Sequence, residues 1–242
     1  MAGRLRLLHT VTEPTGEPFE ARLRRALSFT ATLLKADIGV FSHVEGEAYT
    51  VVAAHSAAPA PAAGDTFPLD DTYCSLTLAH GDVLAIDHMG RSEYAGSQCY
   101  RVFGMESYIG TPVTVGGALY GTLCFAGDAP AVFSDADGDL IRVLASWVGQ
   151  SLDHHSQQTA LVEQSALVQG LYDASPLLMG VVELVDEGDE ADVLHRSANA
   201  ATAALYGTTP EAMRDRTGAE LGPTPGSPGS WPTPRPCRPA PR

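Results

Sequence analysis

The chain has 242 residues, of which 44% are apolar, 7% aromatic and 18% charged. This length can bury one domain and part of a second, and the apolar fraction excludes a wholly disordered chain. The formal net charge is −14, with 29 acidic against 15 basic residues, and we find no basic patch, so we expect no nucleic-acid partner. No run approaches the ~18 apolar residues of a membrane helix, and residues 1–10 lack the apolar core of a secretory signal, so we expect no membrane partner.

Four cysteines are spread widely along the chain: Cys74, Cys99, Cys124 and Cys237. They include no Cys-x-x-Cys pair and follow no signal peptide, so the pattern predicts neither a disulfide framework nor a structural zinc site. We therefore expect reduced thiols, no metal site and a cytoplasmic location.

The first predicted elements are a helix and a hairpin. Residues 17–35 repeat apolar side chains at helical spacing. Residues 38–44 and 49–55 alternate like two strands, joined by a turn over residues 45–47. The predicted buried face of the helix consists of Leu23, Ala26, Leu27, Thr30, Leu33 and Leu34.

Shorter elements are predicted in the middle of the chain. Asp71 or Thr72 can cap a short helix that reaches Leu78. Residues 83–86 read as a short strand, and residues 87–104 as mostly loop. The predicted sheet therefore continues across an irregular segment.

A second hairpin and a long helix follow. Residues 107–115 and 118–126 are predicted strands, because the Gly-Gly pair between them supplies the positive φ angles of a tight turn. Ser134, with Asp137 three residues later, is a capping-box variant that opens a helix near residue 135. About 35 helical residues span roughly 50 Å, more than a small domain needs. We therefore expect a homodimer through residues 135–170, as a parallel coiled coil.

The C-terminal third divides into a small second region and a tail. Residues 177–185 and 192–196 are predicted strands, and residues 199–206 and 210–214 short helices. Residues 222–242 hold eight of the 17 prolines, three arginines and no acid, so they are predicted to be disordered.

Four segments between residues 70 and 152 resemble a GAF domain, in the small-molecule-sensing class common in bacterial signalling proteins. Their order and spacing match the family, and residues 20–69 fit its first helix and hairpin. The resemblance implies an α+β fold over residues 17–153, an antiparallel sheet flanked by helices, after an extension over residues 1–16. The segments are Asp71-Thr72-Tyr73-Cys74-Ser75-Leu76, Leu84-Ala85-Ile86-Asp87, Ser107-Tyr108-Ile109-Gly110-Thr111-Pro112-Val113 and Leu119-Tyr120-Gly121-Thr122-Leu123-Cys124-Phe125.

Residues 171–221 resemble the N-terminal half of a PAS domain, joined to the first domain by a connecting signalling helix over residues 154–170. A PAS fold has a five-stranded sheet, of which only two strands can be placed. Our hypothesis is that the tail reflects a shifted reading frame or an early stop in a longer GC-rich gene. Three further strands encoded in frame in the adjacent DNA would support it, whereas an intergenic region would contradict it. The segments that carry the resemblance are Asp173-Ala174-Ser175-Pro176, Ser197-Ala198-Asn199-Ala200-Ala201, Leu205-Tyr206-Gly207 and Thr209-Pro210-Glu211-Ala212-Met213.

The resemblance implies a pocket whose ligand stays open. GAF domains bind cyclic nucleotides, bilins, haem or small metabolites, and some only dimerise. Covalent bilin attachment usually needs a Cys-His dipeptide, which this chain lacks, and the only asparagine, Asn199, lies outside the GAF region, so the asparagine-led motif of cyclic-nucleotide GAF domains is absent. His80 and His88 flank the region where haem would bind, but both read as solvated loop residues. The cofactor is therefore left unknown.

Six residues are candidates for the pocket wall, each with a plainer role as core or cap. In the plainer interpretation, Tyr108 and Thr111 face the core and Asp87 caps the loop that follows it. No residue is assigned a catalytic role. The candidates are Tyr73, Cys74, Asp87, Tyr94, Tyr108 and Thr111.

Two cysteines form a candidate redox pair. Cys74 is predicted just inside a capped helix, where the backbone N–H groups favour a thiolate. Cys99 is predicted on a mobile loop over the pocket. A GAF family of free-methionine-sulfoxide reductases uses pocket cysteines, but the Cys-led motif of those enzymes is missing here. The plainer alternative is that Cys74 and Cys124 fill the core.

The function expected from the sequence is that of a sensory module of a bacterial signal-transduction protein. A small molecule or a redox change in the GAF pocket would shift a dimeric helix and bias a missing output domain, such as a histidine kinase. No kinase motif lies in this chain, so we expect no enzyme activity. The alternatives are a cysteine-based reductase and a ligand-free dimerisation module.

Overall fold

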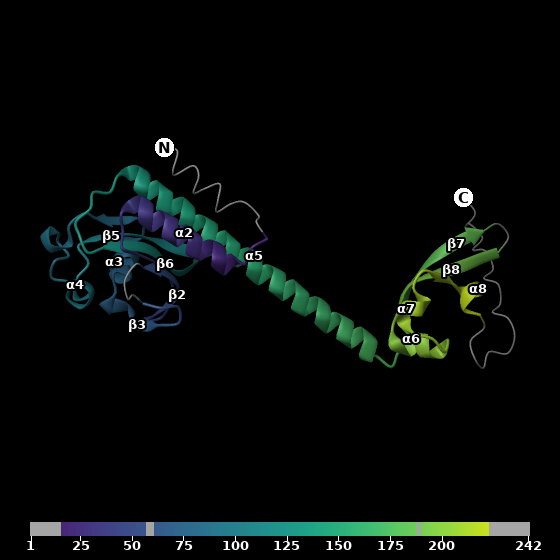
Figure 1. Cartoon of the computed structure of the whole chain (residues 1–242). Coiled ribbons are helices and arrows are strands. Elements are labelled where there is room, and N and C mark those ends of the chain that lie inside the picture. Colours follow the sequence, from purple (N-terminus) through teal and green to yellow (C-terminus); the bar gives the residue numbers. More distant parts are fainter. Residues whose placement is uncertain (1–15, 57–60, 188–189, 223–242) are drawn as a thin grey trace, which may run out of the picture. The chain divides into compact units, whose positions relative to one another are not determined.

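A computed structural model describes residues 16–56, 61–187 and 190–222 (Figure 1). The chain divides into two compact units, Met1–Gln157 and Gln158–Arg242. The predicted N-terminal extension and Pro-rich tail lie outside the described residues, except for Gly16 and Gly222. None of the described helices combines the length and apolar character that crossing a membrane requires.

The first unit is built on a six-stranded antiparallel sheet with the strand order β3-β2-β1-β6-β5-β4. The two predicted hairpins are confirmed as β1–β2 and β5–β6. Gly116 and Gly117, in the second turn, have φ of 58° and 82°, values that glycine adopts without strain. The strands are β1 (Ile38–Glu45), β2 (Ala48–Ser56), β3 (Thr66–Pro68), β4 (Leu84–Ile86), β5 (Ser107–Val115) and β6 (Ala118–Gly127).

Alternation of side chains along these strands creates two cores, one on each face of the sheet. On one face, Phe41, Ile109 and Phe125 are buried under α2 (Phe19–Leu34) and the first half of α5 (Asp135–Ala174). Figure 1 shows these two helices side by side on that face. On the other face a second core forms under α3, α4 and the connecting segments; its sheet residues include Val40, Tyr49, Val51, Tyr108, Cys124 and Ala126.

The predicted first helix is present as α2, but its buried face differs at two positions. Leu33, predicted to be buried, is 37% exposed, whereas Ala31 is buried. Lys35 ends the helix in the left-handed conformation, with φ of 56°, and its backbone N–H donates to the carbonyls of Ala31 and Thr32. The buried stripe therefore runs through Ala31 rather than through Leu33.

The middle segment holds more structure than predicted. The sequence analysis missed β3, and residues 87–104, predicted as mostly loop, contain a 3-10 turn (Met89–Arg91) and α4 (Gln98–Phe103). α3 (Tyr73–His80) follows a 3-10 turn (Leu69–Asp71) and ends at Gly81. Its predicted side-chain cap is absent, because the Thr72 hydroxyl donates to the Leu69 carbonyl at 2.7 Å instead.

The long helix α5 begins where the sequence predicts. The Asp137 carboxylate accepts hydrogen bonds from the Ser134 backbone N–H at 2.9 Å and from the Ser134 hydroxyl at 2.6 Å. This is the carboxylate half of a capping box. Between residues 138 and 149 one face of α5 is buried on the sheet: Gly138, Leu140, Ile141, Leu144, Ala145, Val148 and Gly149.

The second unit has a three-stranded sheet in the order β7-β8-β9. Its core is small, with three buried apolar residues, Ala198, Ala203 and Met213, and packing from Tyr206 and Leu221. The two predicted strands and two predicted helices are present, whereas β9 and α8 were not predicted. The elements are β7 (Gly180–Glu187), β8 (Glu190–Ala198), α6 (Ala200–Leu205), α7 (Pro210–Met213), β9 (Arg216–Thr217) and α8 (Gly218–Leu221).

Candidate functional site

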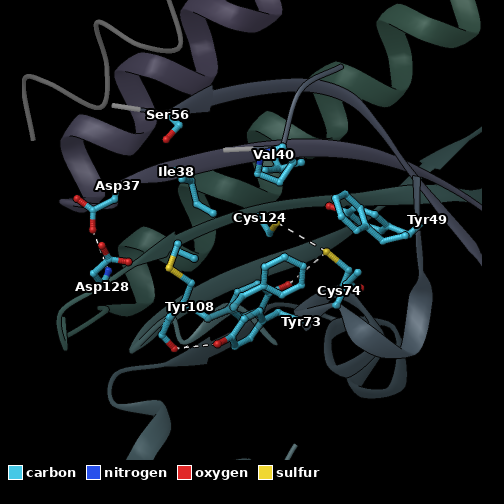
Figure 2. A pocket seen from close by; sticks show the side chains of 16 residues that line it. Asp37, Ile38, Val40, Tyr49, Ser56, Tyr73, Cys74, Tyr108, Cys124 and Asp128 are labelled. Carbon is cyan, nitrogen blue, oxygen red and sulfur yellow. Dashed lines mark hydrogen bonds between the residues drawn. The ribbon is translucent and has the colours of Figure 1, made fainter. Parts of the chain in front are cut away.

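A cavity of about 310 Å³ lies in the first unit, on the face of the sheet that carries α3 (Figure 2). Its volume is at the lower end of the range typical of small-molecule sites. Side chains of β1, β2, β3, β5 and β6 contribute from the sheet, and α3, α4 and neighbouring segments contribute the rest. The lining residues are Asp37, Ile38, Val40, Tyr49, Ser56, Pro61, Phe67, Thr72, Tyr73, Cys74, Phe103, Met105, Tyr108, Cys124, Ala126 and Asp128.

Three of the six predicted pocket residues line this cavity, namely Tyr73, Cys74 and Tyr108. The rings of Tyr73 and Tyr108 stack, with centroids 5.2 Å apart and planes 20° apart. The Tyr73 hydroxyl donates to the Met105 carbonyl at 2.9 Å, and the Tyr108 and Thr77 hydroxyls lie 2.5 Å apart. The two tyrosines therefore form a fixed aromatic wall.

Thr111 is not among the residues that line this cavity, and strand geometry explains why. Successive side chains of a strand point to opposite faces, so residues three apart, such as Tyr108 and Thr111, cannot face the same side. Thr111 is buried and lines a separate groove against the α5 face of the sheet. The prediction of both residues in one pocket was wrong.

Asp87 and Tyr94 also lie outside the cavity lining. One carboxylate oxygen of Asp87 accepts from the Phe133 backbone N–H at 3.0 Å, and its carbonyl accepts from the Ala131 N–H at 3.0 Å. Asp87 therefore holds the segment that leads into α5, whereas the alternative prediction was a cap on the loop that directly follows it. Tyr94 is half-buried against the second core.

Cys99 lies in α4 and is buried, so its predicted place on a mobile loop was wrong. Its sulfur lies 3.2 Å from the Ser97 hydroxyl, and it is not among the cavity-lining residues. Burial raises the pKa of the Cys99 thiol. The geometry therefore does not single out Cys99 as the partner of Cys74.

The sulfur next to Cys74 belongs to Cys124. The two Sγ atoms lie 3.7 Å apart, both residues line the cavity, and Figure 2 shows their side chains directed toward each other from α3 and β6. The Tyr108 hydroxyl donates to the Cys74 sulfur at 3.9 Å. Sequence analysis missed this pair because residues 50 positions apart meet only through the sheet.

The surroundings of the two thiols push their pKa values apart. Burial alone raises the pKa of Cys74, but hydrogen bonds from Cys124, Thr122, Tyr49 and Tyr108 favour its thiolate more strongly and lower the pKa to about 7. The interaction with Cys74, together with burial, raises the pKa of Cys124 well above its usual value. Cys74 is therefore the sulfur that ionises first.

Two carboxylates stand at the solvent side of the cavity. Asp37 and Asp128 are both exposed and both line it, so the cavity reaches the surface. One Asp37 carboxylate oxygen accepts from the Asp128 backbone N–H at 2.8 Å. None of the described lining residues is a lysine, arginine or histidine. Sequence analysis singled out neither aspartate, because no local motif marks them.

The described residues contain no cluster of three metal-ligating side chains, in the sense of His, Cys, Asp or Glu. His88, weighed as a haem-side histidine, instead has its Nδ1 atom 3.0 Å from the Glu106 carboxylate. It is absent from the cavity lining.

Comparison with protein families matches residues 18–152 to the GAF domain. The chain belongs to the GAF family. GAF domains are generally sensory or regulatory ligand-binding modules, and the sheet flanked by helices is the fold that the sequence predicts. A search of curated proteins found no match.

Solved GAF structures share this fold at low sequence identity. The GAF domain of a Coxiella burnetii phosphoenolpyruvate-protein phosphotransferase is 14% identical, with a TM-score of 0.55, and covers 66% of this chain and 98% of its own. The phycocyanobilin-bound GAF domain of a cyanobacterial phytochrome is 12% identical, with a TM-score of 0.53 and coverage of 65% and 95%. The free methionine-R-sulfoxide reductase of Neisseria meningitidis, in complex with its substrate, is 16% identical, with a TM-score of 0.51 and coverage of 64% and 89%.

Proposed function

We propose that this GAF domain is the sensory module of a bacterial, cytoplasmic signal-transduction protein and that a small molecule binds in the cavity beside α3. The observation that carries the proposal is the cavity itself. It reaches the surface at Asp37 and Asp128, and aromatic, aliphatic and sulfur-bearing side chains surround its interior. A ligand there would be desolvated on several sides, as in other small-molecule sites.

The charges at the cavity favour a neutral or cationic ligand. Two carboxylates and no described basic side chain line it, so an anionic ligand would meet repulsion without a compensating partner. The tyrosines Tyr49, Tyr73 and Tyr108 offer faces that attract a cation. A small aromatic or aliphatic amine, with its ammonium group near Asp37 and Asp128, fits this arrangement best.

A signal from the cavity would travel along α5, which we propose to be the dimer helix. Leu144 and Val148 of α5 are buried on the GAF sheet. Farther along, Leu161, Val168 and Leu171 are each at least 60% exposed in the single chain. Burial of these residues against a second copy would stabilise a parallel homodimer.

The second unit supports the proposal of a truncated PAS domain ahead of a missing output domain, such as a histidine kinase. Its short sheet and helices follow the order expected for the start of that fold. Several apolar side chains of its first strand stay exposed, as they would if further strands of the fold were missing. The exposed residues in and before β7 are Leu177, Leu178, Met179, Val181, Val182 and Leu184.

Native mass spectrometry of the purified chain, compared with the denatured spectrum, tests both parts of the proposal. We expect a dimer that carries an additional non-covalent mass, which identifies the ligand. Ala126→Leu should lose that mass and keep the dimer, because Ala126 is buried in the cavity wall and a larger side chain fills the space. Ala145→Leu, a matched enlargement in the other core, should keep it.

The outcomes separate the alternatives. A bare monomer contradicts both the ligand and the dimer helix. A dimer that shows no added mass, and binds none of a panel of small amines, favours the ligand-free dimerisation module. Turnover of free methionine sulfoxide that disappears in Cys99→Ser favours the cysteine-based reductase.

A further inference from the structure

The geometry points to a reversible disulfide between Cys74 and Cys124, formed when a hydroperoxide enters the cavity and oxidises Cys74. This inference rests on the proposed sensory function, with oxidation of the two cavity cysteines as the signal, and it does not require a non-covalent ligand. It assigns the redox chemistry to a pair of cysteines on α3 and β6, instead of the pair that the sequence predicts.

The placement of the two sulfurs is the first argument. Their separation of 3.7 Å must shorten by roughly 1.7 Å to reach the ~2.05 Å of a disulfide. Cys74 is the second residue of α3, a helix of only eight residues, so a small shift of one helix end suffices. Cys124 lies in β6, which is paired with strands on both sides and stays in place.

Access is the second argument. Cys74 and Cys124 are 2% and 7% exposed, yet both line the cavity, which opens to solvent at Asp37 and Asp128. A hydroperoxide is small and uncharged, so the two carboxylates do not repel it. Anionic oxidants would be repelled by the two carboxylates, so the cavity favours an uncharged oxidant.

The neighbours of Cys74 favour the reactive form of its thiol. Its sulfur is surrounded by groups that can donate hydrogen bonds, namely the Cys124 thiol and the hydroxyls of Tyr49, Tyr108 and Thr122. These donors stabilise a negative charge on Cys74, as in known reactive cysteines. Cys124 keeps its proton and is placed to attack in the second step.

The chemistry balances in two steps. The Cys74 thiolate attacks the terminal oxygen of the hydroperoxide; an S–O bond forms, the O–O bond breaks, and the released alkoxide or hydroxide takes up a proton to leave as an alcohol or water. Cys74 is then a sulfenic acid. The Cys124 sulfur attacks the Cys74 sulfur; the S–S bond forms, and the hydroxyl group leaves as water with the Cys124 proton. Overall, two thiols are oxidised and one peroxide is reduced.

The disulfide would change the shape of the cavity. It would tie the start of α3 to β6 and displace the Cys74 sulfur, which accepts a hydrogen bond from Tyr108. Tyr108 stacks on Tyr73, whose hydroxyl donates to the Met105 carbonyl, so the change reaches further residues that line the cavity. A ligand would then meet a different wall in the oxidised protein.

Thiol mapping of the full chain tests the inference. The reduced wild-type protein is treated with hydrogen peroxide, its remaining thiols are alkylated in denaturant, and its peptides are analysed by mass spectrometry. We expect the alkylated forms of Cys74 and Cys124 to disappear together, replaced by one disulfide-linked peptide pair that dithiothreitol reverses. Cys124→Ser should trap Cys74 as a sulfenic acid that reacts with dimedone, and Cys74→Ser should leave Cys124 fully alkylated.

Cys99→Ser is the matched control, because Cys99 is equally buried but lies outside the cavity lining. It should form the Cys74–Cys124 disulfide at the wild-type rate. A disulfide of Cys74 with Cys99 or Cys237, or unchanged Cys74 at tenfold excess peroxide, overturns the inference. Because mapping is done on the wild-type protein, the result does not depend on whether a variant folds. Amine binding that persists while no disulfide forms refutes this inference and leaves the proposed small-molecule sensor standing.

Discussion

The two units of the chain bury their apolar side chains to very different extents. The first has a core on each face of its sheet, with fully buried residues such as Phe41, Phe125 and Ile141. The second buries three apolar residues in its core and leaves Leu184, on its first strand, 79% exposed. A sheet face gains stability only where another layer covers it. Among the described residues, both faces of the first sheet are therefore covered, whereas apolar side chains of β7 in the second unit are not.

The largest expected effect is on the free energy of unfolding, when one apolar side chain is removed from each unit. Phe125→Ala removes a buried ring that packs over Gly39, where a Cβ would collide with it, and should lower the free energy of unfolding by about 3–5 kcal/mol. Leu184→Ala should change it by less than about 0.5 kcal/mol, because its side chain is exposed. Urea denaturation followed by circular dichroism measures both. A large loss for Leu184→Ala would show that something covers the second sheet, and the comparison would fail.

The next effect concerns a buried polar residue on which the second unit depends. Asn199 is fully buried, and its amide group donates to the carbonyls of Tyr172, Ser175 and Leu177. Its oxygen accepts from the backbone N–H groups of Met179 and Thr202. Removal leaves several buried backbone groups unpaired, at a cost of about 1–3 kcal/mol for each one that water does not reach.

Asn199→Ala should therefore open the second unit and leave the first unchanged. Hydrogen exchange should speed up at the amides of Met179 and Thr202, while the amides of the first sheet keep their protection. Thr209→Ala is the control in the same unit, since it removes only the exposed side-chain cap of α7, and it should have a smaller effect. Equal exchange in both units after Asn199→Ala would mean that they unfold as one.

Sequence analysis predicted the elements with strong local signals and missed those that depend on tertiary contacts. The two hairpins of the first unit and the start of α5 carry glycine turns or a capping pair, and all are present. α4 has only six residues, too few to be stable alone, so its helix depends on packing that includes the buried Cys99.

The candidate site was predicted in part for the same reason. Tyr73 and Cys74 are neighbours on α3, so the correct prediction of this one helix also brought both residues to the cavity. Cys124 reaches Cys74 only through the pairing of β6 with its neighbours, which local spacing does not encode. Thr111, in contrast, could have been excluded from the cavity on sequence grounds alone. Side chains alternate along a strand, so Thr111 points to the other face of the sheet from Tyr108.

A smaller effect is the pH dependence that the buried Cys74 thiol gives to the stability of the first unit. The pKa of Cys74 is lowered to about 7 in the folded protein, below the value of 9.0 for a free thiol. A group whose pKa is depressed by folding adds stability that is complete above the unfolded pKa and is lost as the pH falls through the folded one. The stability of wild type relative to Cys74→Ala should therefore rise between about pH 7 and pH 9.

Thiolate absorbance in the ultraviolet, recorded during a pH titration, checks this prediction directly. A step near pH 7 should appear in wild type and in Cys99→Ser, and should vanish in Cys74→Ser. With the pKa lowered from 9.0 to about 7, the thiolate fraction at pH 7 is about fiftyfold higher than for a free thiol, although lower nucleophilicity reduces the gain in reaction rate to about five- to tenfold. A first step only above pH 8.5 would mean that the donors around Cys74 do not stabilise its charge.

The smallest effect tests how tightly the first unit is packed at the edge of its core. Leu33 and Ala31 lie two residues apart on α2, and helical spacing alone predicts burial of Leu33, yet Ala31 is 1% and Leu33 37% exposed. Leu33→Ala should therefore lower the free energy of unfolding by less than about 1 kcal/mol, whereas Ala31→Leu adds volume to a filled core and should cost about 1–3 kcal/mol. Thermal denaturation of the two variants measures the difference. The reverse order would place Leu33 in the core and require α2 to rotate about its axis, which would also move Leu27 and Leu34 out of their buried positions.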